Sequence, residues 1–505
     1  MRKPILVSLT ISALAATAAW AQSPPPSAPT RRAVERRLAA LLDAPPFNRA
    51  AWAIYAVDDK GRVLVDRNGS RFAVPASNTK LVVSAAAAIL LPAEFRTRTS
   101  LLVNGTVTEG VLQGDLILYG RGDPSFSTRC FAVDTLAAGA CDSSSTPIRA
   151  LADSVRTRGI RRITGRVVGD GSYFEPLTQH PNWNAFDLNW WYAAPVTGLA
   201  YNDNAIDFRI TPGAAVDQPP AITWSPDLGM IGFENRARTG PADSGSTIGD
   251  NFYRKQGTWD IWAEGTVALG RRPWVESFAV PDPNLYAARA LAHALQERGI
   301  AIERGSASTT DSLSFRAARC CGAPLAEYAG RPLPELIFPI LNTSQNLFAE
   351  ALLKILGRER GTAGSWSAGL DLERRFLVDS VRVDSTSFAL DDGSGLSAGN
   401  LIAPAAFVQL LRYMAAHPRA GPFLAALPRS GAPGSLRTRF LFTPLEGRVV
   451  AKTGSINRVN TLSGYIEQKD GSRYTFSIQA NSHTVPTRQM LAQIDSVVVA
   501  IGTAK

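Results

Sequence analysis

Histidine and cysteine are scarce in this chain of 505 residues, with four of each. The histidines are scattered, and no C-x-x-C string or histidine cluster has the spacing of metal ligands. We therefore predict no metal and no cofactor. No Ser-His-Asp triad is evident either, so a serine hydrolase built on this chain would need a different base. The four histidines are His180, His293, His417 and His483.

The cysteines, although few, suit an oxidising compartment. Cys130 and Cys141 are separated by ten residues, whereas Cys320 and Cys321 are adjacent. Four cysteines allow three pairings, and the sequence alone cannot choose among them. We expect a disulfide between Cys130 and Cys141, because a loop of this length is easily closed.

The apolar run at the N-terminus is too short for a convincing membrane span. Residues 1–21 have the pattern of an export signal, with Arg2 and Lys3 before an apolar core and Ala19-Trp20-Ala21 as the cleavage site. Residues 22–30 contain several prolines and predict a flexible leader. We expect an exported protein of the periplasm or the cell-wall space. Retention of the signal as an uncleaved anchor stays open.

Basic residues exceed acidic ones, and the formal net charge is +10. Loss of Arg2 and Lys3 with the signal would lower this charge by two, to +8. A positive protein favours anionic surfaces, such as cell-wall polymer or lipid head groups, so peripheral membrane contact is one expectation. No basic helix or stripe of alternating aromatic and basic residues indicates a nucleic-acid partner.

The pattern of helices and strands predicts an α+β fold that is split by an insertion. Apolar periodicity indicates a hairpin over 52–57 and 62–65, strands over 447–456, 462–467 and 472–480, and helices over 32–43, 287–298 and 487–500. A further helix over 344–356 should stop at Gly357. Short strands dominate the stretch from about residue 100 to residue 280. We assign 31–99 and 281–505 to one catalytic domain and 100–280 to one or two inserted β-rich domains.

The first candidate for catalysis is Ser77, in the string Pro75-Ala76-Ser77-Asn78-Thr79-Lys80 before an alanine-rich helix that should end near Pro92. Ser77 and Lys80 are three residues apart, so both side chains lie on one helical face. A serine at the positive end of a helix, one turn from a lysine, is a plausible activated nucleophile. Taken alone, such a string also fits a helix cap beside a solvated lysine.

Two further strings complete a constellation. Ser344-Gln345-Asn346 precedes a predicted helix, and Lys452-Thr453-Gly454 lies on a predicted strand. Each string alone fits a helix cap or a strand end. Together, in the order S-x-x-K, S-x-N and K-T-G, they match the signature of penicillin-binding proteins and serine β-lactamases.

The whole mature sequence resembles the class C low-molecular-mass penicillin-binding proteins, the D-alanyl-D-alanine carboxypeptidases and endopeptidases. The interval between Lys80 and Ser344 leaves room for the insertion typical of that family. Other strings resemble its recurring sequences: 120–124, 201–204, 392–397 and 427–431. This resemblance implies a transpeptidase-like core with an antiparallel sheet, and hydrolysis of peptidoglycan stem peptides and cross-links through an acyl-enzyme. β-Lactams would be covalent inhibitors.

The resemblance also implies roles for individual residues. Ser77 would be the nucleophile, Lys80 the base, and Ser344 the group that passes the proton toward the leaving nitrogen. A lysine can be a base if burial and the nearby cation of Lys452 lower its pKa. The remaining roles fall to the substrate-binding residues Asn346, Lys452 and Thr453, and to an oxyanion hole formed by the backbone N–H groups of Ser77 and Ser455.

Two positions depart from the family pattern, and one inserted loop suggests specificity. Gln345 replaces the commoner Asp but should point away from the substrate, and Ala398 stands where Arg is frequent. The loop 183–187 ends in Asp187, which could pair with a free amino group on the third residue of the stem peptide. Asp187 could equally cap a local turn.

Two other functions remain open at this stage. A serine β-lactamase would share the three motifs, but the long insertion and the lack of an assignable deacylating glutamate argue against it. A non-catalytic cell-wall-binding protein is the second alternative. It would be expected to carry a degenerate motif, whereas all three strings are intact.

Overall fold

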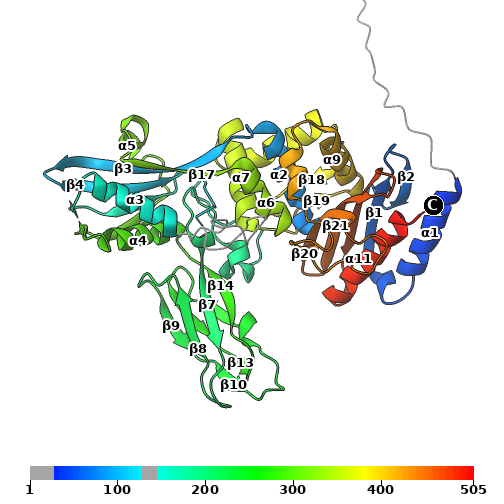
Figure 1. The fold of residues 1–505 in the computed structure, drawn as a ribbon, viewed down its shortest axis with the longest axis horizontal. Coiled ribbons are helices and arrows are strands. Elements are labelled where there is room, and N and C mark those ends of the chain that lie inside the picture. The colour runs from blue at the N-terminus through cyan, green and yellow to red at the C-terminus, as the bar shows by residue number, and fades with distance from the viewer. Residues whose placement is uncertain (1–27, 127–144, 505) are drawn as a thin grey trace, which may run out of the picture.

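The computed structural model describes residues 28–126 and 145–504. Its first unit is a five-stranded antiparallel sheet in the order β2-β1-β22-β21-β20, with strands from both ends of the chain (Figure 1). The strands are β1 (Ala51–Val57), β2 (Val63–Arg67), β20 (Val449–Ile456), β21 (Val459–Glu467) and β22 (Arg473–Asn481). This arrangement confirms the predicted α+β core and its antiparallel sheet.

Helices cover both faces of this sheet. On one face, α1 (Ala28–Leu42) and α11 (Thr487–Gly502) share a core with all five strands. On the other face lies a helical layer built around α2 (Lys80–Leu90), whose residues 80–88 are all buried. A helix that is apolar on every side needs such an enclosed position. The helices that share a hydrophobic core with α2 are α6 (Leu333–Asn342), α7 (Asn346–Arg360), α8 (Trp366–Arg375), α9 (Pro404–Ala416) and α10 (Gly421–Ala426).

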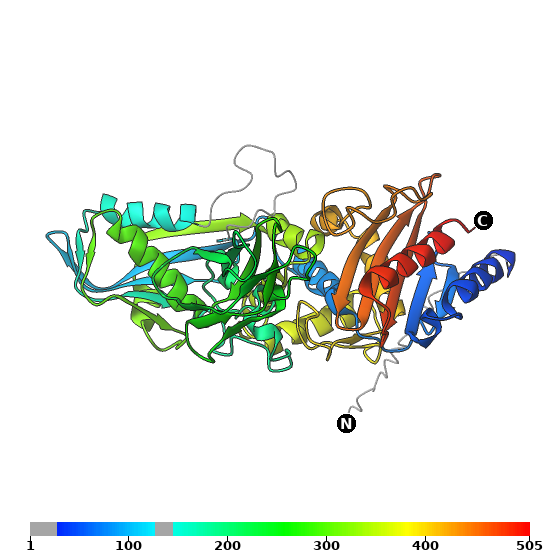
Figure 2. The same cartoon turned by 90° about the horizontal axis from the view of Figure 1, so that it is seen from below.

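The insertion begins with a seven-stranded mixed sheet, visible at the left of Figures 1 and 2. Its strands are β3 (Arg96–Thr108), β4 (Val111–Gly120), β5 (Arg162–Ile163), β6 (Val167–Asp170), β15 (Ala301–Ile302), β16 (Ser306–Thr309) and β17 (Ala326–Pro332). Parallel pairs such as β4 with β6 need a crossover, which α3 (Ser145–Thr157) supplies. The crossover helix for β6 and β16 is α4 (Pro283–Gln296), and α3 and α4 share one buried face of the sheet.

The predicted limits of the insertion, 100 and 280, differ from the sheet that the structure shows. β3 starts at Arg96, and β17 ends at Pro332 while paired with β3. The pairing of β3 with β17 joins strands more than 200 residues apart, which no local sequence pattern records.

A second, smaller β-rich lobe projects from this sheet, coloured green in Figure 1. An aromatic cluster fills it, with ring contacts among Phe208, Phe252 and Phe278. Its three small sheets contain β7 (Ala205–Thr211), β8 (Ala221–Ser225) and β14 (Trp274–Ala279); β9 (Gly232–Asn235), β11 (Phe252–Arg254) and β12 (Asp260–Ala263); and β10 (Arg238–Gly240) with β13 (Thr266–Ala268).

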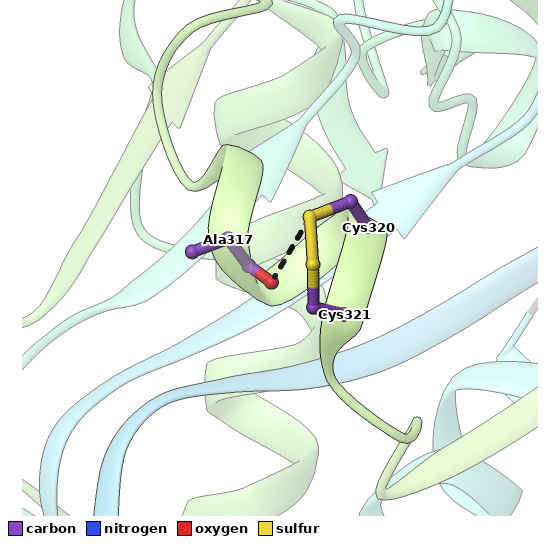
Figure 3. The surroundings of a disulfide bond; sticks show 3 residues. All are labelled: Ala317, Cys320 and Cys321. Atoms are coloured by element: carbon purple, nitrogen blue, oxygen red, sulfur yellow. Dashed lines mark hydrogen bonds between the residues drawn. A yellow bond between two sulfur atoms is a disulfide. The ribbon is translucent and has the colours of Figure 1, made fainter.

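Adjacent cysteines form a disulfide at the end of α5 (Arg316–Cys321), where Cys320 Sγ also lies 3.7 Å from the carbonyl oxygen of Ala317 (Figure 3). The predicted partners Cys130 and Cys141 lie outside the described residues, as do the predicted signal and most of the leader. Of the helices in the described part of the chain, none is long and apolar enough to cross a membrane.

One predicted helix end was wrong. α7 continues past Gly357 to Arg360. A Cβ at Gly357 would lie 2.6 Å from the carbonyl oxygen of Ala363 and 2.8 Å from the nitrogen of Gly369. The glycine therefore permits the close approach of α7 to α8 and the turn between them, and does not stop the helix.

Candidate active site

Ser77 lies in the short helical turn η2 (Ala76–Thr79), which leads directly into α2. Its Oγ accepts a hydrogen bond of 2.9 Å from Lys80 Nζ, as the spacing of three residues predicted. Ala76, just before the serine, has a φ of 46°, a left-handed conformation that is costly for a residue with a Cβ. Such strain concentrates at functional sites, where the surrounding structure enforces it.

Lys80 is completely buried and makes two further hydrogen bonds. Its Nζ donates to Asn346 Oδ1 at 2.7 Å and to the carbonyl oxygen of Ser394 at 2.6 Å. Burial lowers the pKa of Lys80 to about 7, although the carboxylates of Asp392 and Glu350 oppose this shift. A lysine with this pKa is partly neutral near pH 7 and can accept a proton from a serine.

Ser344 and Asn346 lie where α6 gives way to α7. Ser344 has a φ of 68°, so the backbone reverses just before the helix. Asn346, at the start of α7, accepts from Lys80 and donates through Nδ2 to the carbonyl oxygen of Tyr192 at 2.7 Å. Ser344 Oγ accepts a hydrogen bond of 2.9 Å from Lys452 Nζ. The three predicted motifs are thus linked by side-chain hydrogen bonds.

Lys452, on β20, is also fully buried. Burial lowers its pKa well below the usual value, and the charge of Lys80 lowers it further. Sequence analysis predicted that Lys452 would lower the pKa of Lys80. In the structure it is the pKa of Lys452 that the charge of Lys80 lowers. A carboxylate beside Lys452 would favour its charged form. Its neighbour Thr453 is half-buried and donates through Oγ1 to Ser435 Oγ at 3.0 Å.

Gly454 explains how β20 comes so near Ser77. A Cβ at this position would lie 2.9 Å from the carbonyl oxygen of Pro75 and 3.0 Å from the backbone nitrogen of Ser77. Ser455 is the next residue on the strand and is exposed. The close approach brings this end of β20 alongside the Ser77 turn, as a two-donor oxyanion hole requires.

Four of the predicted site residues, Ser77, Ser344, Asn346 and Ser455, border a cavity of about 590 Å³, a size that suits a small ligand. Lys80 and Lys452 lie buried behind the wall. The wall contains Ser77, Ser344, Asn346 and Ser455, together with Asn184, Phe186, Asp187, Trp191, Tyr192, Thr343, Leu396, Ile456 and Asn457.

The inserted segment contributes one side of this cavity. Asp187 starts the short helical turn η3 (Asp187–Asn189), and its Oδ1 accepts a hydrogen bond of 2.9 Å from the Tyr192 hydroxyl. The segment places Asp187 at the same cavity as Ser77. The partner of the Asp187 carboxylate, Tyr192, is five residues later in the chain.

Sequence analysis assigned no role to two buried acids, Asp392 at the start of the loop 392–397 and Glu350 on α7. Asp392 and Glu350 are fully buried and accept hydrogen bonds from the backbone of this loop. The string Asp392-Gly393-Ser394-Gly395-Leu396-Ser397 marked the loop but not the function of its first residue. Ala398, the departure noted in the sequence, is exposed and does not line the cavity.

Gln345 points away from the cavity, as predicted, but has a structural role. Its side chain accepts from Leu347 N at 3.2 Å and donates to Asp203 Oδ2 at 3.0 Å. Within the described residues, no group of three or more histidine, cysteine or acidic side chains has the arrangement of a metal site.

Comparison with known proteins decides the family. The profile of the D-Ala-D-Ala carboxypeptidase 3 (S13) family matches residues 34–500. The chain belongs to this family. It is 30% identical over 474 residues to a D-alanyl-D-alanine carboxypeptidase of Actinomadura sp. (strain R39), with 92% of this chain and 83% of the relative covered.

Solved structures agree with the S13 fold. Penicillin binding protein 4 (dacB) from Haemophilus influenzae aligns with a TM-score of 0.78 and 23% identity, over 92% of this chain and 98% of that chain. A structure of the same protein complexed with a β-lactam aligns with a TM-score of 0.72, also at 23% identity and with the same coverage. The predicted family, fold class and enzyme class are confirmed. The roles of individual residues stay predictions.

Proposed function

We propose that this protein is a serine D-alanyl-D-alanine carboxypeptidase and endopeptidase that cleaves peptidoglycan stem peptides and cross-links through an acyl-enzyme. One observation supports this above all others. The Oγ of Ser77 lies 2.9 Å from the Nζ of a fully buried lysine whose pKa burial lowers to about 7. This pair supplies a nucleophile and a base without histidine.

In the acylation step, Ser77 Oγ attacks the carbonyl carbon of the penultimate D-alanine, and its proton passes to neutral Lys80. The oxyanion that forms accepts hydrogen bonds from the backbone N–H groups of Ser77 and Ser455. Collapse of the tetrahedral intermediate breaks the peptide bond. The proton moves through Ser344 to the leaving nitrogen, so D-alanine departs as a neutral amine and Ser77 carries the acyl group.

Three residues would hold the substrate during this step. Asn346 would bind the peptide amide, in exchange for one of its present partners, Lys80 or Tyr192. Lys452 and Thr453 would bind the terminal carboxylate. Burial lowers the pKa of Lys452, and a bound carboxylate would oppose this shift by favouring the charged form of the lysine.

In the second step, water replaces the leaving amine. The water attacks the ester carbonyl and gives a proton to Lys80. The bond between the acyl carbon and Ser77 Oγ then breaks, and the proton returns to Ser77 Oγ. A β-lactam would acylate the same serine, and its ring-opened product stays tethered and keeps water from the ester. The β-lactam complex of the Haemophilus influenzae protein supports this expectation.

Asp187 would select substrates with a free amino group on the third residue of the stem peptide. Its carboxylate lies on the cavity wall, held by the Tyr192 hydroxyl. A charge-assisted hydrogen bond to an ammonium group contributes about 1.5–3 kcal/mol. The protein would act outside the cytoplasm after export, with peripheral contact to anionic wall or membrane surfaces favoured by its positive charge.

A deacylating glutamate, which would favour a β-lactamase, is not assignable among the described residues at the cavity. Of the described residues that line the cavity, none is a glutamate, and the buried Glu350 is engaged by Trp366 and the loop 392–397.

Incubation with purified muropeptides and mass analysis of the products tests the proposal. Loss of one terminal D-alanine shows carboxypeptidase activity, and conversion of cross-linked dimers to monomers shows endopeptidase activity. Rapid turnover of a fluorescent penicillin with no change in muropeptides would favour the β-lactamase. Neither labelling nor hydrolysis would favour a wall-binding protein.

A further inference from the structure

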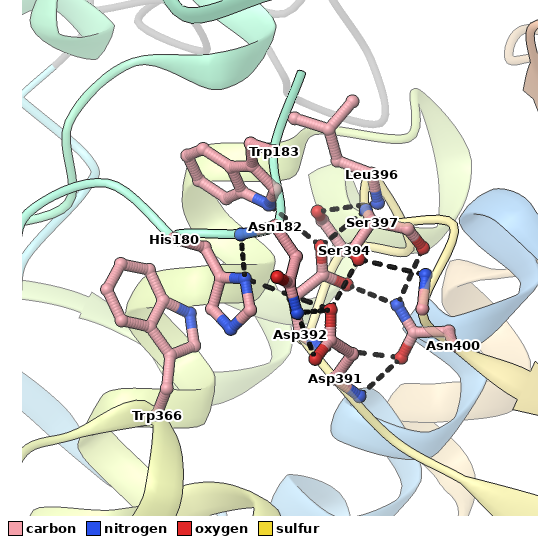
Figure 4. A network of polar contacts seen from close by, with 12 residues as sticks. His180, Asn182, Trp183, Trp366, Asp391, Asp392, Ser394, Leu396, Ser397 and Asn400 are labelled. Atoms are coloured by element: carbon pink, nitrogen blue, oxygen red, sulfur yellow. Dashed lines mark hydrogen bonds and ion pairs between the residues drawn. The ribbon is translucent and has the colours of Figure 1, made fainter. Parts of the chain in front are cut away.

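Beneath the active site, one buried carboxylate accepts hydrogen bonds from two distant parts of the chain. Asp392 is 0% exposed. Its Oδ1 accepts from Gly395 N at 2.7 Å and from Asn400 Nδ2 at 2.8 Å, and its Oδ2 accepts from Ser397 N at 2.8 Å. A fourth donor is Trp183 Nε1 at 2.9 Å, from the inserted segment 209 residues away (Figure 4).

The first three bonds fix a loop that reaches the catalytic lysine. Ser394, within this loop, accepts from Lys80 Nζ through its carbonyl oxygen at 2.6 Å. Leu396, two residues later, lines the cavity. Glu350 of α7 holds the other side of the loop by accepting from Ser394 N at 2.7 Å and Gly393 N at 3.1 Å. The loop is thus clamped between two buried carboxylates.

The fourth bond anchors the segment that carries Asp187 and Tyr192. Trp183 is 6% exposed, and its ring packs edge-on against Trp366 of α8 at 6.0 Å between centroids. Next to it, Asn182 Nδ2 donates to both carboxylate oxygens of Asp391 at 3.0 and 3.1 Å. These contacts hold the start of the inserted segment, residues 182–192, as Figure 4 shows. A hydrogen bond from Asn346 Nδ2 to the carbonyl oxygen of Tyr192 holds its end.

We propose that Asp392 is a positioning residue that holds two walls of the active site in register: the loop that contacts Lys80 and the inserted segment that reads the substrate. An aspartate that only formed its own tight turn would need no more than the loop N–H groups. Here, one carboxylate oxygen is shared between Ser397 N and Trp183 Nε1, so neither wall can shift without breaking a buried bond of the other. This inference rests on the proposed function.

Replacement by Asn tests the electrostatic part of this role. An amide has one acceptor oxygen, so its NH₂ group would face two N–H donors that now bind oxygen. The Asp392 carboxylate also raises the pKa of Lys80 against burial. Its neutralisation would lower that pKa and move the acid limb of acylation to lower pH. The substitution leaves the other titratable groups around the two residues unchanged: Glu350 on α7, Glu373 on α8, Lys452 on β20, Asp391 and His180.

The experiment compares three variants by penicillin acylation, peptide hydrolysis and hydrogen exchange. Asp392→Asn should slow penicillin acylation about tenfold or more, with the acid limb displaced to lower pH. Trp183→Phe removes the indole N–H donor and keeps a smaller aromatic ring, and it should raise KM for stem peptides about fivefold, with kcat changed less than twofold. Trp224→Phe is the matched control, because Trp224 Nε1 has no hydrogen-bond partner in the described structure. It should change neither parameter by more than about twofold.

Hydrogen exchange gives a readout that needs no activity. Asp392→Asn and Trp183→Phe should both increase exchange over residues 183–192, and Asp392→Asn alone should also do so over residues 393–397. A folded Asp392→Asn protein with wild-type acylation, pH limb and exchange would overturn the proposal. A Trp183→Phe protein with the same KM, kcat and hydrogen exchange as Trp224→Phe would also overturn the proposal. This comparison tests the proposal even if Asp392→Asn does not fold. A wild-type protein that neither acylates nor hydrolyses would overturn the proposed function instead, and the exchange data would still test the coupling.

Discussion

The side-chain amide of Gln345 donates a hydrogen bond of 3.0 Å to Asp203 Oδ2, and both residues are buried. Gln345 also caps α7 by accepting from Leu347 N. The central residue of S-x-N therefore ties α7 to Asp203 in the short helical turn η5 (Asn202–Asn204), although it does not line the cavity. A glutamine suits this position because its amide is neutral and can donate to a buried carboxylate.

Gln345→Glu should destabilise the protein at pH 8 by about 3 kcal/mol, because it places two buried carboxylates within hydrogen-bond distance. One of the two pKa values would be raised, so the loss of stability should shrink as the pH falls through that raised value. Chemical denaturation at pH 8 and pH 5 measures the effect. The double variant Gln345→Glu with Asp203→Asn restores a donor–acceptor pair and should recover much of the stability. A double variant no more stable than Gln345→Glu would show that the two side chains are not coupled.

Ser77→Ala should abolish covalent labelling by a fluorescent penicillin, because it removes the attacking oxygen and nothing else. The fold should be retained, as a thermal melt within a few degrees of the wild type would show. Ser125→Ala is a suitable control, because it removes a serine hydroxyl that bonds to Asp123 and does not line the cavity. Labelling of Ser77→Ala at the wild-type rate would mean that another residue is the nucleophile.

The rate of penicillin acylation should rise with pH through about 7, the value to which burial lowers the pKa of Lys80. The neutral form of the lysine is the base, and its fraction increases about tenfold between pH 6 and pH 8 for a group with this pKa. Stopped-flow labelling across pH 5–9 measures the limb. A rate that is flat over this range would exclude a lysine base with this pKa.

A local string was enough to predict the contact between Ser77 and Lys80. Ser77 and Lys80 are one helical turn apart, so their contact at 2.9 Å follows from their spacing. The meeting of Lys452 with Ser344 spans 108 residues, and its prediction depended on the family resemblance. The buried carboxylate of Asp392 was missed because its partner Trp183 is 209 residues away, and an aspartate before glycine indicates only a turn.

Other features could not be derived because one residue type serves two purposes. Glycine ends helices and also permits close packing, and Gly357 does the second. Burial of Lys80 and its lowered pKa were predicted, but the opposing Asp392 and Glu350 lie on separate elements that only the fold brings together. The same holds for the insertion, whose sheet joins β3 to β17 across the length of the inserted region.

The remaining cysteine prediction can be checked by peptide mapping. Digestion of protein purified without reductant should yield the Cys130 and Cys141 peptides joined by a disulfide. The adjacent pair provides an internal reference, since Cys320 and Cys321 should appear within one peptide that lacks two hydrogens and resists alkylation until reduction. Recovery of Cys130 and Cys141 as alkylated thiols would contradict the predicted pairing.

The final prediction concerns how the inserted segment reads the substrate. Asp187 lines the same cavity as Ser77, and the Tyr192 hydroxyl orients its carboxylate at 2.9 Å. Asp187→Ala should therefore lower kcat/KM about ten- to a hundredfold on stem peptides with a free side-chain amine. On the same peptides with that amine acetylated, the loss should be much smaller, because no ammonium group is present to pair. Tyr192→Phe keeps the carboxylate and should give an intermediate loss. An equal loss on both peptides would instead indicate altered cavity geometry, and no loss on either would remove Asp187 from substrate recognition.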